Sequence, residues 1–410
     1  MYIDRHISKI IERQQRKKKV IILTGPRQVG KSTMLKTILK PKGTAYVSLD
    51  NPTIRQVAIE NPSRFLELNK APLIIDEIQK APFLFEYIKE IVDESKEMGL
   101  YYLTGSQSFR LMKDVTESLA GRVGIVNMLG LSLREINNVN FTEPFKPTSE
   151  YFNSVGNIDV LRRINIADII HKGSFPALYE TEYNNSEWMD YYSSYLQTYI
   201  EKDIRDVINV QNMSAFIKFI KAIAAISGEQ LSYTTLAELC GMDVNTTKRW
   251  CSILETSGLI YILQPYYNNY NKRLIKTPKI YFLDTGLICY LGGWNTSEQL
   301  INGARWGHIF ETYIVSEIIK GFYNSGIIYP PLYYYRDKEK NEIDLIIEEG
   351  NTLCPIEIKT TSEPKKSMIK NFELLQDVPG KQVIDGALIC LTKTLVPLTD
   401  NVTAIPAEMI

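Results

Sequence analysis

The residues best suited to chemistry form a glycine-bounded run, Thr24-Gly25-Pro26-Arg27-Gln28-Val29-Gly30-Lys31-Ser32-Thr33. The run has the spacing G-x-x-x-x-G-K-S, follows an apolar stretch at 20–23 and precedes a segment of helical character at 34–39. Strand, glycine loop and helix are the context in which this pattern binds phosphate. We therefore predict that the backbone N–H groups of residues 25–33 hold ATP, with Lys31 at the β- and γ-phosphates and Ser32 on Mg²⁺. A glycine-rich turn that binds nothing is the alternative.

Two acids, Asp76 and Glu77, follow the apolar run Leu73-Ile74-Ile75. Such a run fits a strand of a parallel sheet that is covered on both faces. At the carboxyl end of that strand, Asp76 would hold Mg²⁺, and Glu77 would orient and polarise the water that attacks ATP. Acids also end strands at ordinary surfaces, but this pair lies about 45 residues after the glycine loop.

A further predicted strand at 100–104 ends in polar residues, among which Thr104, Ser106 and Gln107 are candidates to sense the γ-phosphate. In P-loop ATPases with an additional strand, this strand lies between the other two, which here are the strand before the glycine loop and the strand that ends in the two acids. A simple turn is an equal alternative for the polar residues. Arg122 is a candidate arginine finger, acting in cis or on a neighbouring subunit. A surface ion pair is the other interpretation of Arg122.

Five motifs together resemble a bacterial and archaeal family of AAA-type ATPases: GPRQVGKST, YVSLDNP, LIIDEIQ, LTGSQ and SLAGRV…LSLREI. Gly173-Ser174-Phe175-Pro176 and the run at 199–205 look like the helical segment of that family. The resemblance covers nearly the whole chain. It implies an ATP site and a C-terminal domain related to PD-(D/E)xK nucleases, but it implies no settled cellular role.

The C-terminal third contains the residues that this nuclease signature requires. Glu311 lies in an amphipathic helix at 306–322, and Asp344, Glu357 and Lys359 lie on two alternating strands joined near Gly350. A turn centred on Gly350 would place Asp344 opposite Ile356, so a bulge or an off-centre turn is needed to bring it beside Glu357. Asp344 and Glu357 would share a divalent metal, and Lys359 would stabilise developing charge or tune the attacking water. Glu311 would approach from the helix; whether the site cleaves or only binds nucleic acid stays open.

These motifs predict an α/β multidomain protein. The predicted parts are a P-loop AAA-type ATPase domain with a parallel sheet at 1–136, a linker and helical lid at 137–215, a winged helix-turn-helix at 216–292, and an α/β restriction-endonuclease-like domain at 293–410. In the winged helix, Asn245, Thr246, Lys248 and Arg249 would reach base edges, and Lys272 and Arg273 would contact phosphate. Packing or subunit contact is an equal alternative for this segment.

Composition sets few further limits on the 410 residues. Lys+Arg and Asp+Glu balance at 47 each, so the net charge indicates no polyanion partner. Five scattered cysteines predict reduced core residues rather than disulfides or a zinc site. Because no apolar run approaches the length of a membrane span and no signal peptide is visible, we expect a cytoplasmic protein without membrane association.

Two hypotheses of different class follow. In the first, Mg-dependent ATP hydrolysis controls DNA binding or metal-dependent nuclease activity at the C-terminal site. In the second, the chain is a nucleotide-dependent switch that binds a protein partner, and its nuclease-like domain is catalytically silent. A homo-oligomer is compatible with either hypothesis.

Overall fold

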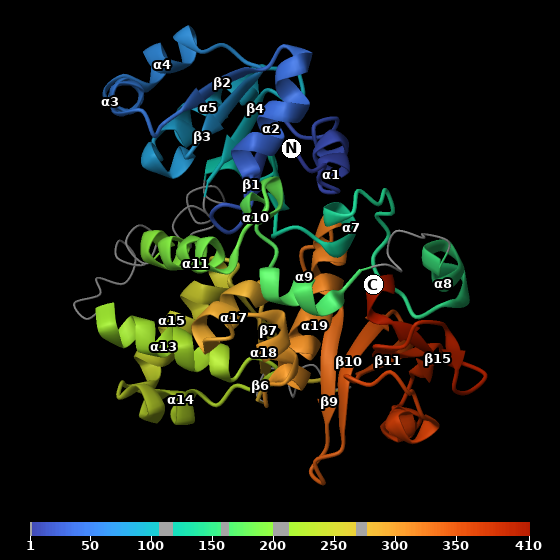
Figure 1. The fold of residues 1–410 in the computed structure, drawn as a ribbon. Helices are drawn as coiled ribbons and strands as arrows, with labels where there is room; N and C mark the ends of the chain where they lie inside the picture. The colour runs from blue at the N-terminus through green and yellow to red at the C-terminus, as the bar shows by residue number, and fades with distance from the viewer. Residues whose placement is uncertain (1, 106–117, 157–163, 200–212, 268–276) are drawn as a thin grey trace.

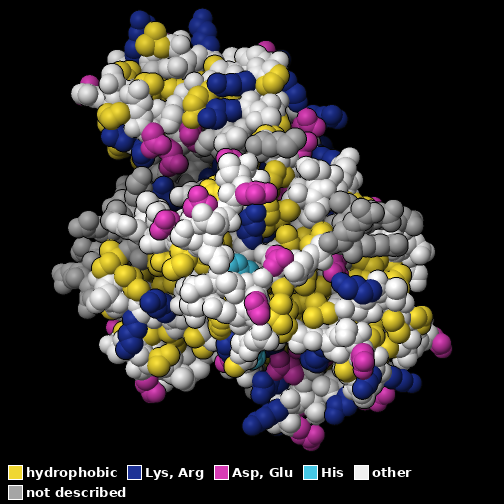
Figure 2. Space-filling view, viewed as in Figure 1, with side chains coloured by type: hydrophobic (Ala, Val, Ile, Leu, Met, Phe, Trp, Pro, Cys, Tyr) yellow, Lys and Arg dark blue, Asp and Glu magenta, His cyan; other side chains and the backbone are white. Residues whose placement is uncertain are grey.

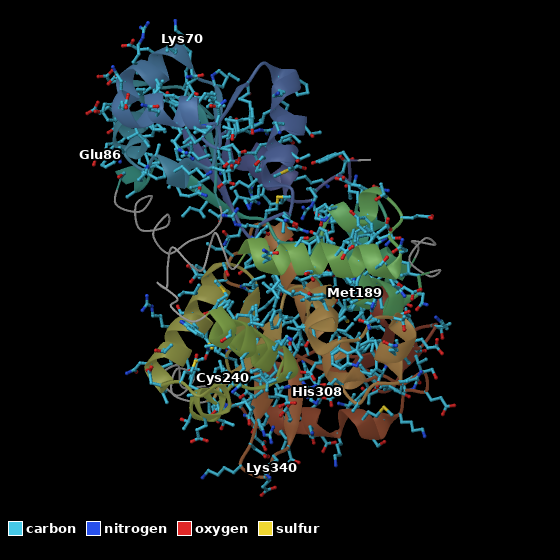
Figure 3. All side chains as sticks on the ribbon, turned by 60° about the vertical axis from the view of Figure 1, so that its left-hand side comes forward. Lys70, Glu86, Met189, Cys240, His308 and Lys340 are labelled. Atoms are coloured by element: carbon cyan, nitrogen blue, oxygen red, sulfur yellow. The ribbon has the colours of Figure 1, made fainter. Side chains whose placement is uncertain are left out.

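The computed structural model describes residues 2–105, 118–156, 164–199, 213–267 and 277–410. An N-terminal lobe stands apart from a larger body that contains the middle and C-terminal segments (Figure 1). Lys70 on the N-terminal lobe and Lys340 on the C-terminal segment lie at opposite ends of the molecule (Figure 3). Within the described residues, no helix is long and apolar enough to cross a membrane.

The N-terminal lobe is built on a five-stranded sheet in the order β2-β3-β4-β1-β5, with every neighbouring pair parallel. Its strands are β1 (Val20–Thr24), β2 (Ala45–Ser48), β3 (Leu73–Asp76), β4 (Tyr101–Thr104) and β5 (Val123–Asn127). The prediction that an additional strand lies between the other two is confirmed, because β4 pairs with both β1 and β3.

Helices cover both faces of this sheet. They are α1 (Ser8–Gln14), α2 (Lys31–Leu39), α3 (Pro52–Glu60), α4 (Pro62–Leu68) and α5 (Leu84–Glu94), with the short 3-10 helices η1 (Lys40–Lys42) and η2 (Ile78–Lys80). Successive side chains of a strand point to opposite faces. Ile21 and Leu23 accordingly belong to one apolar core, and Val20 and Ile22 belong to another. Both faces of the sheet are therefore covered, as the unbroken apolar runs predicted.

The middle of the chain is mainly helical. It contains α7 (Leu133–Ile136), α8 (Ser149–Gly156), α9 (Ile166–Lys172), α10 (Ala177–Glu180) and α11 (Asn185–Tyr199). Helix α9 packs on α17 (Thr285–Gly292) and α18 (Ser297–Ile301), and α11 also contacts α17. Between α9 and α10, the carbonyl oxygen of Ser174 accepts a hydrogen bond from the N–H of Leu131, which follows β5 (2.7 Å). The apolar faces of these helices belong to the same core as Ile21 and Leu23 of β1, and a lid over the N-terminal lobe stays a prediction.

A compact group of helices and strands follows. It contains α13 (Met213–Ala225), β6 (Glu229–Gln230), α14 (Tyr233–Cys240), α15 (Val244–Thr256), β7 (Ile260–Leu263) and β8 (Lys279–Phe282). The strands form an antiparallel sheet in the order β6-β8-β7. Trp250 and Leu254 on α15 are buried. The predicted hairpin tip, which includes Lys272 and Arg273, lies outside the described residues.

The C-terminal segment has a mixed sheet in the order β14-β15-β13-β11-β10-β9, with β12 paired to β11. Its elements are α19 (Trp306–Asn324), β9 (Leu332–Arg336), β10 (Glu342–Glu349), β11 (Thr352–Ile358), η5 (Lys366–Leu375), β12 (Gln382–Val383), β13 (Gly386–Cys390), β14 (Val396–Pro397), β15 (Val402–Pro406) and η6 (Ala407–Met409). Strands β9, β10 and β11 are antiparallel, whereas β11, β13 and β15 are parallel. All five cysteines of the chain are buried and unbonded, as predicted.

Candidate functional sites

The glycine loop connects β1 to α2 in a conformation that its glycines make accessible. Gly25 has φ 139° and Gly30 has φ 89°, both in the region that favours glycine. A Cβ on Gly25 would collide with the carbonyl oxygen of Met128, which follows β5. Gly30 is the N-cap of α2, so the loop leads directly into the N-terminus of a helix of 9 residues. Unpaired N–H groups at such a terminus favour an anion.

Lys31 points back over this loop. Its Nζ donates to the carbonyl oxygens of Gly25 (3.0 Å) and Pro26 (2.6 Å), and the residue is only 8% exposed. The ammonium group is therefore already held at the loop.

Asp76 joins three strands at the same edge of the sheet. Its Oδ1 accepts hydrogen bonds from the hydroxyls of Ser32 (2.5 Å) and Thr104, and its Oδ2 accepts from the hydroxyl of Tyr46 (2.8 Å). The structure therefore brings Ser32 and Asp76 together, as a shared Mg²⁺ site requires. Burial and the hydrogen bond to Asp76 raise the pKa of Tyr46 to about 12, so this phenol stays a donor.

Glu77 lies beside this network in a left-handed conformation, with φ 58°. Its backbone N–H donates to Thr104 Oγ1 (3.4 Å), and its Oε2 accepts from Gln79 Nε2 (2.5 Å). Burial raises the pKa of the Glu77 carboxyl, although the neighbouring Arg27 opposes the shift. Of the three candidate γ-phosphate sensors, Thr104 lies at this edge and contacts Asp76, whereas Ser106 and Gln107 lie outside the described residues.

A second acidic site lies on the β10–β11 hairpin. Leu345 pairs with Ile356, and the same register places Asp344 opposite Glu357. The turn is off-centre with respect to Gly350, which is one of the two predicted ways to bring these carboxylates together. Lys359 Nζ lies 2.6 Å from Glu357 Oε1 and 3.4 Å from Asp344 Oδ2. The N–H of Ile358 also donates to Asp344 Oδ2 (2.8 Å).

Glu311 reaches the same neighbourhood from α19, but its direct partners come from β8. Its Oε1 accepts from Lys279 Nζ (2.9 Å) and from the hydroxyl of Tyr281 (2.7 Å). Lys279 Nζ also lies 2.6 Å from Oε1 of Glu342. The sequence analysis missed Lys279, Tyr281 and Glu342; the available signal was a lysine inside an otherwise apolar strand.

The electrostatics of this site are those of buried acids held by two lysines. Burial, followed by the charge of Asp344, raises the pKa of Glu357 to about 8. Burial likewise raises the pKa of Glu311, although Lys279 opposes the shift. Burial alone would lower the pKa of Lys279, but its acidic neighbours and Tyr281 reverse that effect and raise it well above the usual value.

Oxygen ligands for a divalent cation are present but are engaged by lysine. Oε2 of Glu357 is buried and has no hydrogen-bond partner in the described structure, and the residue is 6% exposed. No group of three His, Cys, Asp or Glu side chains within the described residues is arranged to hold a metal. Mg²⁺ is commonly bound through only one or two carboxylates together with substrate phosphates, and Asp344 and Glu357 fit that requirement.

Three family models match successive parts of the chain. Residues 17–137 match an AAA domain, residues 163–298 match a domain of unknown function (DUF8612), and residues 306–410 match another (DUF4143). The first match covers the glycine loop, Asp76 and Glu77. Residues 17–137 are therefore similar to an AAA domain and contain its P-loop, and this part of the chain is called the AAA domain below.

Two relatives are similar to this chain over most of its length. Uncharacterized proteins of Mycobacterium tuberculosis and Mycobacterium bovis are each 27% identical over 396 residues, which are 95% of this chain and 80% of the relative.

Among solved structures, a Walker-type ATPase of Pyrococcus abyssi has a TM-score of 0.45 and 14% identity, covering 71% of this chain and 96% of that one. The Holliday junction branch migration motor RuvB of Thermotoga maritima has a TM-score of 0.30 and 16% identity, covering 63% of this chain and 89% of that one.

Within the AAA domain, the structure does not bring Arg122 to the P-loop. Arg122 precedes β5, and its carbonyl oxygen accepts from the N–H of Val20 at the amino end of β1 (3.3 Å). The P-loop begins at the other end of β1, about 13 Å away along four residues of strand. The guanidinium instead pairs with Asp93 at the surface, with Nη2 2.9 Å from Oδ2. A role for Arg122 in cis is therefore not supported, and a role on a neighbouring subunit stays a prediction.

Two small pockets lie between the AAA domain and the larger body in the described part of the chain. The first is below the P-loop, where Pro26 and Val29 line it together with Phe175, Gly258 and Asp284. Asp284 accepts hydrogen bonds from the N–H (2.6 Å) and hydroxyl (2.7 Å) of Ser174 and from the hydroxyl of Tyr192 (2.9 Å). Asp284 thus fastens the Gly173–Pro176 segment to the end of β8.

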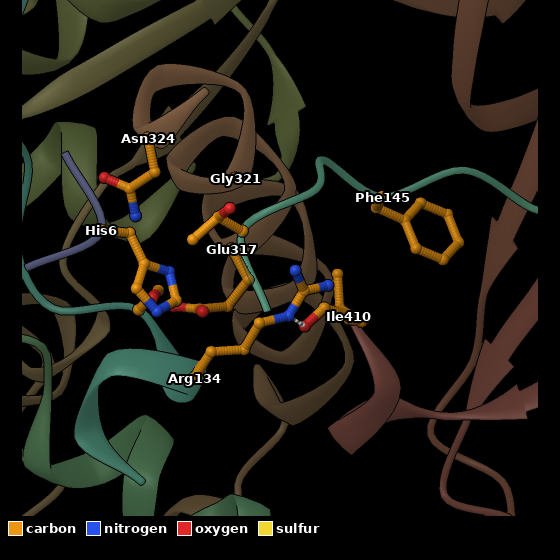
Figure 4. A pocket seen from close by; sticks show the side chains of 9 residues that line it. His6, Arg134, Phe145, Glu317, Gly321, Asn324 and Ile410 are labelled. Carbon is orange, nitrogen blue, oxygen red and sulfur yellow. Dashed lines mark hydrogen bonds between the residues drawn. The ribbon is translucent and has the colours of Figure 1, made fainter. Parts of the chain in front are cut away.

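The second is a small pocket between α7 and α19 (Figure 4). Arg134 Nε donates to the carbonyl oxygen of Ile410 (3.0 Å), and Glu317 Oε2 accepts from the N–H of Leu133 (2.7 Å). The charged side chains that line this pocket are already paired. These hydrogen bonds connect the AAA domain to the C-terminal segment, so the residues around this pocket have a structural role.

Proposed function

We propose that this protein hydrolyses Mg-ATP at its AAA domain and uses the nucleotide state to control a metal-dependent nucleic-acid site in its C-terminal segment. The observation that carries the first part is the array of Ser32, Asp76 and Thr104 beside Lys31 and Glu77. Two parallel strands, β3 and β4, and the N-terminus of α2 deliver these groups to one edge of the sheet. Phosphoryl transfer depends mainly on such positioning and on charge stabilisation.

Each residue at the ATP site has a separate role in this proposal. The loop at 25–33 and Lys31 would hold the phosphates, while Ser32 and Asp76 would hold Mg²⁺, which neutralises charge on the phosphates. Glu77 would orient the attacking water and accept its proton. A carboxyl with a raised pKa is better matched to proton transfer near neutral pH than an ordinary one.

The proposed chemistry of the C-terminal site is metal-dependent phosphodiester hydrolysis. Its support is the arrangement of a helix, three antiparallel strands and a parallel continuation, with Asp344, Glu357 and Lys359 gathered on the hairpin. Asp344 and Glu357 would hold a divalent cation, which supplies Lewis-acid stabilisation of a phosphate. Lys359 would stabilise negative charge that develops on that phosphate.

Strand β8 supports control of one site by the other. Its N-terminal residue Lys279 lies among the acids of the C-terminal site, and Asp284, two residues after its last residue, lines the pocket below the P-loop. The two residues are separated by about 17 Å of extended chain. A Cβ on Gly258, which precedes the adjacent β7, would lie 3.0 Å from ring carbons of Pro26 in the P-loop. A shift of the P-loop therefore has a short packed route to Lys279.

We propose the winged-helix segment as the DNA-binding part. Asn245, Lys248 and Arg249 are exposed near the start of α15, and the sheet β6-β8-β7 has the order expected of such a domain. On the face shown in Figure 2, basic side chains are interspersed with acidic ones. We therefore expect weak, salt-sensitive DNA binding rather than tight binding to a single basic surface.

The rival function, a nucleotide-dependent switch with a silent C-terminal site, is favoured by one observation. Lys279 and Lys359 already neutralise the carboxylates that a metal would need. In that case nucleotide binding would change a surface that a protein partner recognises, and no nucleic acid would be cleaved.

One cleavage experiment distinguishes the two proposed functions. Plasmid and oligonucleotide substrates are incubated with Mg²⁺ or Mn²⁺, with and without ATP, using wild type, Lys31→Ala and an Asp344→Ala/Lys359→Ala double variant. The proposal expects metal-dependent cleavage that responds to ATP in wild type, loses that response in Lys31→Ala and is lost in the double variant. Lys381→Ala is the matched control, because Lys381 pairs with Glu348 farther along the same hairpin (2.6 Å).

Absence of both cleavage and DNA affinity in wild type under all these conditions would exclude the nucleic-acid function. ATP hydrolysis, measured by phosphate release in the same samples, tests the AAA site independently. Hydrolysis without any nucleic-acid activity would leave the switch as the surviving function.

A further inference from the structure

Lys279 is a buried lysine within the C-terminal acidic site. It is 2% exposed, and its Nζ lies 2.9 Å from Glu311 and 2.6 Å from Glu342. The ring of Tyr334 lies on another side, with its centroid 5.6 Å from Nζ. A buried ammonium requires such partners, because an unpaired charge away from water is costly.

The position of this lysine is fixed by strand pairing. Lys279 pairs with Leu263 of β7 and with Gln230 of β6. Beyond β7, Pro265 forms a parallel bridge with Tyr334 of β9, and the N–H of Tyr266 donates to the carbonyl of Tyr334 (2.6 Å). The middle sheet is thereby joined to the C-terminal sheet beside the acids.

We propose that Lys279 is a built-in cation of this site that competes with a divalent cation for its carboxylates. The inference rests on the proposed function, because it takes Asp344 and Glu357 as the cation ligands. It adds that a residue of the preceding segment determines whether they are occupied. Lys279 pairs directly with Glu311 and Glu342, and its positive charge also interacts electrostatically with Asp344. Each effect weakens the attraction of the site for a second cation.

The distribution of charge supports this inference. Glu311, Asp344 and Glu357 lie close to the buried Lys279, and the partly exposed Lys359 pairs with Asp344 and Glu357. Glu342 is paired with both Lys279 and Arg336 (2.8 Å). The unpartnered Oε2 of Glu357 is a ligand atom that the present ion pairs leave unused. Removing the Lys279 charge would leave the acids with excess negative charge, which a divalent cation can neutralise.

The test is Mn²⁺ binding to the nucleotide-free, full-length protein, followed by the electron paramagnetic resonance signal of free Mn²⁺. The neutral variants Lys279→Met and Lys279→Gln should bind one Mn²⁺ at least tenfold more tightly than wild type, equivalent to about 1.4 kcal/mol. Lys279→Arg, which keeps the charge, should bind like wild type. Lys381→Met controls for loss of a lysine elsewhere, because Lys381 precedes β12 of the C-terminal sheet and pairs with Glu348. Adding Asp344→Asn to the neutral variants should remove the tight site.

Neutral variants that bind Mn²⁺ no more tightly than wild type would overturn the inference. If wild type already binds Mn²⁺ tightly through Asp344, the inference fails while the proposed function stands. If tight binding in the variants survives Asp344→Asn, both the inference and the proposed cation ligands are wrong.

A measurement on wild type avoids any loss of folding in the variants. Because the two cations compete, saturating Mn²⁺ should increase acetylation of Lys279 by acetic anhydride, read by mass spectrometry against Lys381. Unchanged acetylation of Lys279 at Mn²⁺ saturation would contradict competition.

Discussion

The replacement Lys31→Met tests the ATP site directly, because it removes the ammonium group and keeps most of the side-chain length. In the structure this ammonium donates to the carbonyl oxygens of Gly25 and Pro26, and Lys31 is almost fully buried. When phosphates bind, it can exchange these neutral acceptors for charged ones. The variant would retain the loop glycines and α2, and would lose this exchange.

The magnitude follows from the energy of a hydrogen bond to a charged group. Such a bond contributes about 1.5–3 kcal/mol, so we expect ATP affinity to fall about 10- to 150-fold. At an ATP concentration 100 times the wild-type Kd, ATP should stabilise wild type by about 2.7 kcal/mol. A variant with a Kd weakened 100-fold should gain only about 0.4 kcal/mol at the same concentration.

The assay is thermal unfolding of both proteins over a titration of Mg-ATP, with Lys42→Met as the control. Lys42 follows α2 in the sequence, is exposed and pairs with Glu12 (3.0 Å), so its loss should leave the ATP response unchanged. If Lys31→Met is stabilised by Mg-ATP as strongly as wild type, the nucleotide site has been placed wrongly.

Two further predictions concern the AAA domain and its junction. Glu77→Gln should retain ATP binding within about threefold while ATP hydrolysis falls about 10²–10⁴-fold, measured by phosphate release beside an equilibrium binding assay; equal losses of binding and hydrolysis would contradict a role in activating water. Glu135→Gln should lower the free energy of unfolding by about 3–5 kcal/mol in urea, because it leaves the buried guanidinium of Arg5, now 3.1 Å from Glu135, without its counter-charge. Burial alone would raise the pKa of Glu135, but Arg5 and His6 hold it below its usual value. The stabilisation by this ion pair is therefore complete above the ordinary carboxyl pKa and is lost as pH falls through the lower folded pKa. A difference in stability between variant and wild type that persists unchanged into strong acid would be inconsistent with the ion pair.

Much of the ATP site could be predicted because its signals are local. A strand, a glycine loop and a helix follow one another in the sequence, and parallel strands deliver their carboxyl ends to one edge. Ser32 and Asp76 therefore meet although 44 residues separate them. The same reasoning worked for Asp344 and Glu357, where the hairpin restricted the register to a few choices.

Arg122 could not be placed by such reasoning. The motif around it shows a charge but does not show which end of a strand the charge occupies. The observed pairing with Asp93 depends on where α5 ends relative to β5. The packing of the middle helices cannot be predicted for a similar reason. The apolar faces of α9 and α11 are visible in the sequence, but the identity of their packing partners is a tertiary property.

Lys279 lies in one predicted domain and pairs with acids of the next, so its surroundings cannot be predicted by treating the domains separately. An ion pair buried inside a protein contributes little to stability compared with apolar residues of the same volume. The burial of Lys279 between Glu311 and Glu342 therefore calls for a reason other than folding energy. Acids that must remain in the interior to receive a cation need a counter-charge while the cation is absent, and Lys279 supplies it. Because its strand also reaches the pocket below the P-loop, the group that neutralises the acids is itself attached to the part of the protein that nucleotide binding would move.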